Sequence, residues 1–359
     1  MKVVHYHWEA ATGKDGVSFA VRGWARAMAA EGLSVSIACE DGASAEDSDE
    51  VNWITVPHTG RDRLRAPHSL GPHVSDADLV VIHSAWLWAN SRAAAAAHKA
   101  GVPYIVMPHG GYDPFILRRR RALKKAMWAT IESRIARRAA AAHVFFAAEK
   151  PHLEALGYRG PLLIVPNGVS IPREWSWDGG SGGYLLWLGR LDAEHKGLDL
   201  LVEAVAGLPA SERPQLRIHG TGWKEGREQL EREIRNRAVQ DWVEIRPPVY
   251  GDDKWRTLAQ ATGFVYPSRW EACSISILEA AAIGLPIIAT PYPLARFLAE
   301  RSAAVLVDRS PAGIREGLAH IQDSAAQLCR NARDVARQEL SWRAVTRSWI
   351  DQVQPLLKG

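Results

Sequence analysis

The sequence has few cysteines and no long apolar run. Cys39, Cys273 and Cys329 are spread over 359 residues, and their odd number and wide spacing argue against a disulfide framework or a zinc site. No stretch reaches the roughly 20 apolar residues that cross a bilayer, and residues 1–7 lack the apolar core of a signal peptide. We therefore expect a cytoplasmic protein with reduced thiols.

The composition is that of a soluble globular protein. Hydrophobic residues make up 47% and charged residues 23% of the chain, which excludes disordered and fibrous classes. The length exceeds the usual size of one domain, about 100–200 residues. We expect two hydrophobic cores.

The net charge of +4 is small but unevenly spread. Nine basic residues and one acid lie between Arg118 and Arg138, whereas Glu40 to Glu50 contains six acids and no base. A nucleic-acid-binding protein would spread its basic residues more widely. The pattern favours a localised anionic surface as a partner and no nucleic acid.

Short apolar runs alternate with helical patterns along the whole chain, which is typical of an α/β fold with parallel sheets. Each half is expected to form a Rossmann-like unit. The predicted strands are 2–5, 33–39, 52–56, 78–83, 103–108, 143–147, 184–189, 215–220, 242–246, 263–267, 286–290 and 304–307. The predicted helices are 17–31, 88–99, 116–137, 150–156, 198–206, 224–239, 253–260, 275–283 and 313–322.

The two predicted domains span residues 1–172 and 184–341. Residues 173–183 between them are rich in Gly and Ser, which predicts a flexible linker. The last segment, 342–357, has apolar residues at helical intervals and is expected to form a helix that crosses back onto the first domain.

Two cations flank the loop after the strand at 184–189. Arg190 and Lys196 stand where a strand opens into a helix, so they could hold a diphosphate beside the positive end of that helix. Two solvated loop charges would give the same pattern, and the spacing alone does not separate the two interpretations.

Two glutamates follow the strand at 263–267. Glu271 lies on the loop, Ser274 is placed to cap the next helix, and Glu279 lies inside its apolar run. A carboxylate there needs partners such as ribose hydroxyls. A solvent-facing position or a neighbouring arginine would also explain Glu279.

These motifs resemble the family 4 retaining glycosyltransferases, which have the GT-B fold of two Rossmann-like domains facing across a cleft. The likeness is carried by Leu188 to Leu198, His219 to Gly222, Pro267 to Glu279 and Ala282 to Ile288. The first half resembles the family through Pro108-His109-Gly110-Gly111, Glu149-Lys150 and Val165 to Val169.

The resemblance implies roles for individual residues. Arg190 and Lys196 would bind the donor diphosphate and stabilise the leaving group. Glu271 would contact the transferred sugar, and Glu279 the ribose. His109 would approach the donor sugar from the first domain, which would bind the acceptor.

The backbone of several small residues would also line the donor site. The sequence departs from the family after Glu271, because Ala272-Cys273-Ser274 replaces a glycine-containing stretch, and the donor sugar is therefore left open. The predicted donor-binding positions in this group are Gly13, Gly16, Gly220, Gly222, Ala272, Cys273 and Ser274.

Two nucleotide-binding alternatives fail on spacing. A P-loop would need Gly at Trp8 and Ser or Thr at Asp15. The glycines at 220 and 222 do not form a dinucleotide fingerprint, because its third glycine would fall at Glu225.

The sequence thus predicts a retaining hexosyltransferase that moves a sugar from a nucleotide-diphosphate donor to a glycan or lipid-linked hydroxyl, in bacterial polysaccharide or glycoconjugate synthesis. No cofactor and no metal are expected. An epimerase or phosphorylase of the same fold and a non-catalytic carbohydrate-binding protein remain alternatives.

One further prediction concerns the basic segment at 116–137. This helix is expected to attach peripherally to an anionic membrane. A solvated basic face and an anionic soluble acceptor are the alternatives. The cations assigned to this surface are Arg118, Arg119, Arg120, Arg121, Lys124 and Lys125. Histidines other than His109 are expected to be structural or rim residues: His5, His7, His58, His83 and His219.

Overall fold

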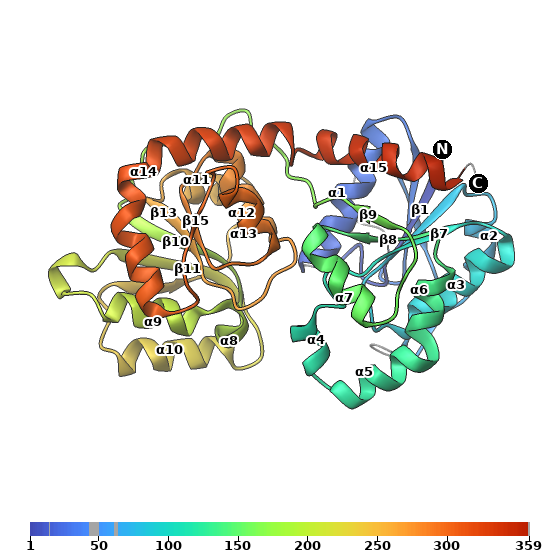
Figure 1. Cartoon of the computed structure of the whole chain (residues 1–359), viewed down its shortest axis with the longest axis horizontal. Coiled ribbons are helices and arrows are strands. Elements are labelled where there is room, and N and C mark those ends of the chain that lie inside the picture. The colour runs from blue at the N-terminus through green and yellow to red at the C-terminus, as the bar shows by residue number, and fades with distance from the viewer. Residues whose placement is uncertain (14, 43–49, 61–63, 358–359) are drawn as a thin grey trace. The chain divides into compact units, whose positions relative to one another are not determined.

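The computed structural model describes residues 1–13, 15–42, 50–60 and 64–357, and most of the acidic run from Glu40 to Glu50 lies outside them. The chain divides into two compact units (Figure 1). The first contains residues 1–168 and 342–359, and the second contains residues 169–341. The boundary thus falls four residues before the predicted end of the first domain at 172.

The main sheet of the first unit has seven parallel strands in the order β3-β2-β1-β6-β7-β8-β9. The strands of this unit are β1 (Lys2–Tyr6), β2 (Ser34–Cys39), β3 (Val51–Thr55), β4 (His58–Thr59), β5 (Ala66–Pro67), β6 (Leu79–His83), β7 (Tyr104–Met107), β8 (Ala141–Val144) and β9 (Leu162–Ile164). Its helices are α1 (Gly16–Ala30), α2 (Gly71–Val74), α3 (Trp88–Ala100), α4 (Pro114–Arg118), α5 (Arg121–Met127), η2 (Trp128–Glu132), α6 (Ser133–Arg138), η3 (Ala147–Glu149), α7 (Lys150–Ala155) and α15 (Trp342–Leu357).

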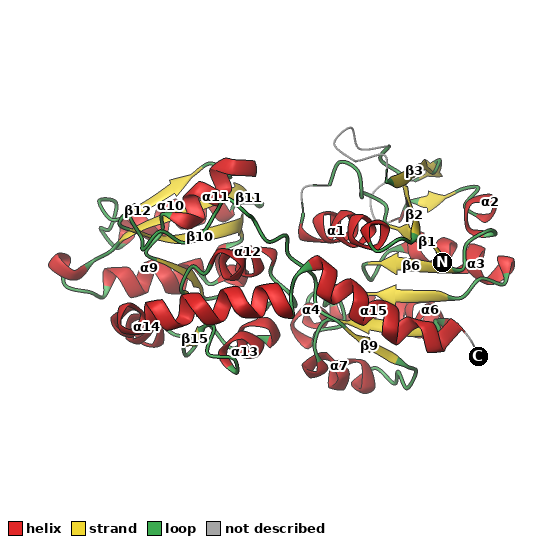
Figure 2. Ribbon diagram, turned by 90° about the horizontal axis from the view of Figure 1, so that it is seen from above, coloured by secondary structure: helices red, strands yellow, loops and turns green. Residues whose placement is uncertain are grey.

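The second unit has six parallel strands in the order β12-β11-β10-β13-β14-β15. Its strands are β10 (Tyr184–Leu191), β11 (Gln215–Gly222), β12 (Val243–Arg246), β13 (Gly263–Tyr266), β14 (Ile287–Ala289) and β15 (Val305–Leu306). Its helices are α8 (Ala193–Lys196), α9 (Leu198–Ala206), η4 (Ala210–Glu212), α10 (Gly226–Asn236), α11 (Gly251–Ala259), α12 (Ile275–Ile283), α13 (Pro293–Ala299) and α14 (Pro311–Gln338). In Figure 2 the strands of each unit are surrounded by helices.

The central strands of both sheets are buried on both faces, as in other parallel sheets. All five residues of β6 and all four of β7 and β13 are buried. The predicted α/β class with two Rossmann-like units is confirmed. None of the described helices is long and apolar enough to cross a membrane.

Helix α15 joins the first unit by packing on α1. The ring of Trp342 lies 5.5 Å from that of Trp24, edge to face, and the Trp24 indole donates a 3.0 Å hydrogen bond to Asn167 Oδ1. A Cβ at Gly23 would come within 2.1 Å of the Trp342 ring. The close approach of the two helices therefore depends on a glycine at position 23.

The segment 173–183, predicted to be a flexible linker, is hydrogen-bonded to the second unit over part of its length. The Trp177 amide donates to the Ile283 carbonyl at 2.8 Å and its indole to the Ala261 carbonyl at 2.8 Å. The Gly182 amide donates to the Gln260 carbonyl at 2.9 Å. These bonds attach the glycine-rich segment to the second unit, and a composition argument cannot foresee them because their partners are distant in sequence.

The prediction of one continuous helix over 116–137 is wrong. Helix α4 ends at Arg118, and Arg120 adopts a left-handed conformation with φ of 53° before α5 begins. A continuous helix would place like charges three and four residues apart on one face, which is destabilising. A π-helical turn, η2, then separates α5 from α6.

Candidate functional site

The carboxyl ends of β10 and β13 carry the predicted donor-site residues. These two strands are neighbours at the point where the strand order of the second sheet reverses. In open parallel sheets, ligands bind at this switch point, where the loops on either side separate. Arg190 lies at the end of β10, Lys196 ends the short helix α8 that follows it, and Glu271 comes from the loop after β13.

Lys196 and Glu271 form a buried ion pair. The Lys196 ammonium contacts Glu271 Oε1, and both groups are about one-tenth exposed. Burial lowers and the Glu271 carboxylate raises the pKa of Lys196, and the net pKa lies above its usual range. Lys196 therefore stays charged in the resting site, with its charge compensated by Glu271.

Two further side chains hold Glu271 in place, and sequence reasoning missed both. The Tyr266 hydroxyl lies 3.2 Å from Glu271 Oε1 and 3.2 Å from the Lys196 ammonium. The Ser268 hydroxyl lies 3.2 Å from the same carboxylate oxygen. Tyr266 is the last residue of β13 and Ser268 follows two residues later. Their place at the end of this strand was the one feature of the sequence that could have indicated a role in the site.

The absence of a side chain at Gly197 brings the two loops together. Gly197 has φ of 67°, and a Cβ there would lie 1.9 Å from the Pro267 carbonyl oxygen. Lys196 is the last residue of α8, which is capped at its start by Asp192. Gly197 thus sets the distance between the loop that carries Lys196 and the loop that carries Glu271.

Arg190 lies near the carboxyl end of β10. Its guanidinium lies over the Trp223 ring, 4.2 Å from the centroid, and its Nε is buried without a hydrogen-bond partner. No ion pair involving Arg190 occurs among the described residues. Trp223 is 41% exposed, and its place after Gly220-Thr221-Gly222 was the signal for it in the sequence.

Glu279 lies on α12 and is paired with a lysine, not with the arginine that one alternative suggested. Lys254 Nζ, on α11, donates to Glu279 Oε1 at 2.5 Å. Burial raises the pKa of Glu279 although the Lys254 ammonium opposes the shift. Lys254 could not be predicted, because α11 and α12 meet only in the folded unit.

The residues between the two glutamates differ in exposure. Ala272 and Ser274 are buried, and Cys273 is half-buried. The prediction that Ser274 caps α12 through its hydroxyl is wrong, because no side-chain hydrogen bond caps this helix. Its first-turn amides are therefore not occupied by a capping side chain.

The two glycines after β11 have different surroundings. A Cβ at Gly220 would lie 2.1 Å from the Gly189 carbonyl oxygen, so this glycine allows β11 to pack beside β10. A Cβ at Gly222 would meet no atom within 4 Å. Only Gly222 leaves open space of the kind expected for a donor-lining position.

The glycine loop of the first unit is occupied by protein contacts. The Gly13 amide donates to the Glu9 carbonyl at 3.2 Å. Behind Gly16, the Asp15 carboxylate accepts from Val17 N at 2.7 Å and Ser18 N at 3.1 Å. The Gly13 amide is therefore occupied by a protein acceptor, and an acidic side chain already caps the helix that Gly16 begins.

His109 lies in the loop after β7 of the first unit. Its backbone is in the left-handed region, with φ of 50°, and its Nε2 lies 2.9 Å from His83 Nδ1. Burial and the His7 and His143 imidazoles hold the pKa of His109 well below its usual range. This histidine is neutral at neutral pH.

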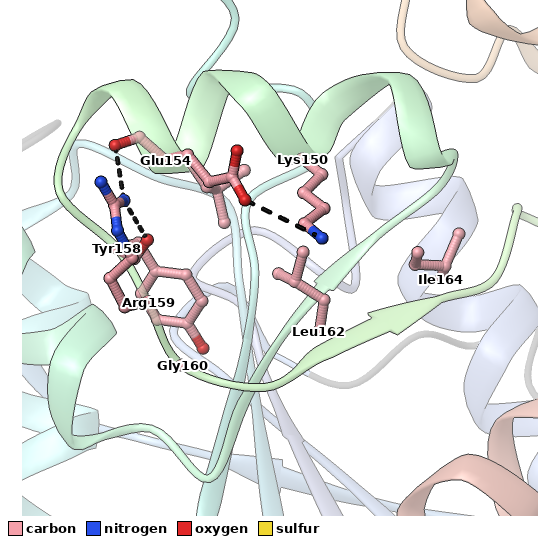
Figure 3. Close-up of a pocket in the computed structure, with 8 residues that line it drawn as sticks. Lys150, Glu154, Tyr158, Arg159, Gly160, Leu162 and Ile164 are labelled. Atoms are coloured by element: carbon pink, nitrogen blue, oxygen red, sulfur yellow. Dashed lines mark hydrogen bonds and ion pairs between the residues drawn. The ribbon is translucent and has the colours of Figure 1, made fainter.

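A cavity of the first unit lies away from the predicted site residues. This cavity of about 420 Å³ is lined by α7 and β9 and by the turn between them (Figure 3). Lys150 and Glu154 form an ion pair there at 3.9 Å, and the Arg159 guanidinium donates to the backbone carbonyl of Glu154 at 2.7 Å. It contains none of the predicted catalytic or donor-binding residues. Within the described parts of the chain, no cluster of three or more His, Cys, Asp or Glu side chains is arranged to hold a metal ion.

Both units match known families. The family described as Glycosyl transferases group 1 matches residues 182–323, and the Glycosyl transferase 4-like domain matches residues 15–168. The chain is 24% identical over 310 residues to GDP-mannose:cellobiosyl-diphosphopolyprenol alpha-mannosyltransferase of Xanthomonas oryzae, covering 84% of this chain and 80% of that protein.

Solved structures share the fold. Sucrose-phosphate synthase from Thermosynechococcus elongatus superposes with a TM-score of 0.79 at 17% identity, covering 100% of this chain and 99% of that one. Anabaena HepE, in complex with UDP-glucose, superposes with a TM-score of 0.75 at 16% identity, covering 99% of this chain and 100% of that one. With both units matched and the fold shared, the chain belongs to the group 1 glycosyltransferases and has the GT-B fold.

Proposed function

We propose that the protein transfers a hexose from a nucleotide-diphosphate sugar to a hydroxyl of a glycan or lipid-linked acceptor, with retention of anomeric configuration and without a metal ion. The observation that carries this proposal is the cluster of Lys196, Glu271 and Tyr266, together with Arg190 at the end of β10, which has no ion-pair partner among the described residues. Two cations and a buried carboxylate at the switch point suit a ligand that combines a diphosphate with a sugar.

The proposed reaction breaks the bond between the anomeric carbon and the donor phosphate oxygen. The acceptor oxygen attacks from the same face, and its proton passes to the departing phosphate. Arg190 and Lys196 stabilise the charge that develops on this phosphate, as preorganised cations do. Glu271 and Glu279 then act as binders of the sugar and the ribose, and no covalent enzyme intermediate forms.

The relatives suggest where to begin the search for substrates. The Xanthomonas relative is named for GDP-mannose and a diphosphopolyprenol-linked acceptor, and HepE was crystallised with UDP-glucose. We propose a glycan on a polyprenyl diphosphate as the first acceptor class, in bacterial polysaccharide or glycoconjugate synthesis. GDP- and UDP-hexoses are the first donors to test.

The test is a panel of UDP-, GDP- and ADP-sugars, measured for binding by calorimetry and for turnover with and without acceptor and EDTA. A transferase releases nucleoside diphosphate faster when acceptor is present, and EDTA leaves the rate unchanged. Isomerised nucleotide sugar would identify an epimerase, and acceptor-dependent release of a sugar phosphate would identify a phosphorylase. Binding without any turnover would support a carbohydrate-binding protein and overturn the proposal.

We further propose that the basic segment attaches to an anionic membrane surface through charge. Arg118 to Arg121 and Lys125 are exposed, and Leu123 is 52% exposed. Lys124 differs, because its ammonium contacts the Ile116 carbonyl at the end of α4. The apolar residues Leu117, Met127 and Trp128 pack against the core of the first unit, so attachment would depend on Lys and Arg, each contributing about 1 kcal/mol near an anionic bilayer.

Vesicle sedimentation tests this attachment. Binding to phosphatidylglycerol vesicles should exceed binding to neutral vesicles, weaken with salt and fall when Arg118 to Arg121 become Ser. Substitution of Arg134, Arg137 and Arg138 by Ser serves as the control, since these are exposed arginines that are not among the cations assigned to the membrane surface. Equal, negligible binding to both vesicle types would reject attachment and leave the transferase proposal untouched.

A further inference from the structure

Three imidazoles form a hydrogen-bonded chain across the first sheet. His5 lies on β1, His83 at the end of β6 and His109 just after β7, and these three strands are neighbours. His5 Nδ1 lies 2.8 Å from His83 Nε2, and His83 Nδ1 lies 2.9 Å from His109 Nε2. In each of these two contacts, one ring nitrogen therefore donates a hydrogen bond and the other accepts it.

The inner end of this histidine chain is fixed by a sulfur atom. His5 Nε2 lies 3.3 Å from Sδ of Met28, on α1. A thioether carries no proton and can only accept a hydrogen bond, weakly. The proton of neutral His5 is therefore best placed on Nε2, which leaves Nδ1 of His5 as an acceptor.

The rings are neutral, so each has one donor and one acceptor nitrogen. Burial and the His143 imidazole lower the pKa of His5 to about 3, and burial with the neighbouring imidazoles holds the pKa of His83 well below its usual range. His83 must then donate from Nε2 to His5, and His109 must donate from Nε2 to His83. The remaining nitrogen, His109 Nδ1, carries a bare lone pair.

The opposite arrangement of protons is less favourable. It would turn the His5 Nε2 lone pair toward the Met28 sulfur, so that the contact at 3.3 Å would lose its hydrogen bond. Since one arrangement has this buried hydrogen bond and the other lacks it, the first should be preferred on the order of tenfold.

His109 is also held from its other sides. Its ring meets that of Phe145 edge to face, with centroids 5.5 Å apart. The next turn is tight, because a Cβ at Gly111 would lie 2.8 Å from Ala85 Cβ and 2.9 Å from the Pro108 carbonyl oxygen. Within the described residues, Nδ1 of half-buried His109 has no hydrogen-bond partner and is not sealed from solvent.

We propose that Met28, His5 and His83 are positioning residues that hold His109 as the Nε2–H tautomer, so that its Nδ1 accepts a hydrogen bond from a substrate hydroxyl. A neutral acceptor nitrogen favours a hydroxyl and disfavours a carboxylate or a phosphate oxygen. The identity of the hydroxyl as one on a sugar rests on the proposed function, whereas the tautomer does not.

The tautomer is measured on the full chain labelled with ¹⁵N-histidine, by long-range ¹H–¹⁵N spectra at pH 7. The signals of His109 are assigned by their loss in His109→Gln. We expect a protonated Nε2 and a bare Nδ1. A protonated Nδ1, or an imidazolium, would overturn the proposal.

Met28→Leu removes the sulfur with little change in volume, and Met127→Leu is the matched control. The two tautomers of His109 should approach equal populations in Met28→Leu, while Met127→Leu keeps the wild-type spectrum. His83→Phe should have the same effect as Met28→Leu. If His109 keeps its tautomer in both Met28→Leu and His83→Phe, the histidine chain does not position His109.

The hydroxyl is identified with monodeoxy analogues of whichever donor the panel selects. One analogue should bind about tenfold more weakly than its parent to the wild type, and equally well to His109→Ala. If every analogue loses affinity equally in both proteins, His109 does not accept from a sugar hydroxyl. Because the spectra need no turnover, loss of the transferase proposal would leave the tautomer result interpretable by itself.

Discussion

Six strands of the first sheet and the six strands of the second follow the same order along the chain, yet the side chains after their central strands differ in charge. In the second unit, Lys196 and Glu271 are charged and paired. In the first unit, His83 and His109 are neutral, because burial and neighbouring imidazoles lower their pKa. The same strand order therefore supports a charged pair in one unit and a pair of neutral imidazoles in the other, and the residues that follow the strands decide which.

This difference follows from the partners each edge offers. Lys196 can exchange the Glu271 carboxylate for a diphosphate, because its ammonium keeps its charge. Glu271 can then accept a hydrogen bond from another donor. Neutral imidazoles cannot compensate an anion, but they can accept from hydroxyls without the cost of desolvating a charge. The predictions below test this contrast, beginning with the largest expected effect.

Lys196→Ala should have the largest effect. It removes a proposed leaving-group cation and leaves Glu271 without its partner, so kcat/KM should fall about 100- to 1000-fold, about 3–4 kcal/mol. Steady-state kinetics measure the loss, and circular dichroism confirms folding. Arg227→Ala, at an exposed pair with Glu231, is the control and should change kcat/KM by less than twofold; equal effects of the two variants would remove Lys196 from the donor site.

Glu132 tests the uncharged character of the first unit. This buried carboxyl accepts from the Trp86 amide and the Tyr112 hydroxyl, while its Oε2 has no partner. Burial raises its pKa from 4.5 to about 7, against those two hydrogen bonds. The native state therefore binds more protons than the unfolded chain between these values, and stability should fall as the pH rises through this window.

The wild type should lose about 3 kcal/mol of stability between pH 5 and pH 8 because of Glu132, since each pKa unit corresponds to about 1.4 kcal/mol. Glu132→Gln should not show this loss. Urea unfolding at the two pH values measures the change. Glu154→Gln, at a half-exposed side chain, is the matched control and should keep the wild-type dependence. An unchanged pH dependence in Glu132→Gln would show that this carboxyl is ionised without penalty.

Glu279→Ala should weaken donor binding by about 1–3 kcal/mol, roughly five- to 150-fold in KM for the donor, with a smaller change in kcat. The loss follows from the proposed contact with the ribose. Initial rates at varied donor concentration separate the two constants, with the exposed Glu231→Ala as control. A fall in kcat at constant donor KM would instead place Glu279 in the reaction step.

An exposed ion pair should contribute least. Arg347 Nε lies 2.8 Å from Glu31 Oε2 and joins α15 to α1, but the Arg347 side chain is 55% exposed. Arg347→Ala should lower the free energy of unfolding by under about 1 kcal/mol, as measured by urea unfolding. A loss of several kcal/mol would mean that this pair, and not the Trp24 and Trp342 contact, holds α15 in place.

The alternation of apolar and helical segments was enough to predict both sheets and the helix at the C-terminus. The three-residue strand β9 was missed, and α14 was predicted too short, because it continues to Gln338, well beyond the predicted end at 322. An alternation pattern needs more residues than β9 offers, and the polar outer face of α14 hides its length.

The candidate site was predictable only in part. Lys196, Glu271 and Glu279 stand out because charged residues follow strands or interrupt apolar runs. Their partners Tyr266 and Lys254 do not, since a tyrosine at a strand end and a lysine on a helix have ordinary positions in the sequence. The pairing depends on tertiary contacts that spacing does not encode.

The absence of a Cβ at Gly197 limits which substitutions this site can accept. Because a Cβ there would meet the Pro267 carbonyl at 1.9 Å, any other residue at 197 would push the loop of Lys196 away from the loop of Glu271. Residues 272–274 carry no such restriction from a positive φ. Attempts to redirect the enzyme to a new sugar should therefore diversify residues 272–274 and leave position 197 untouched.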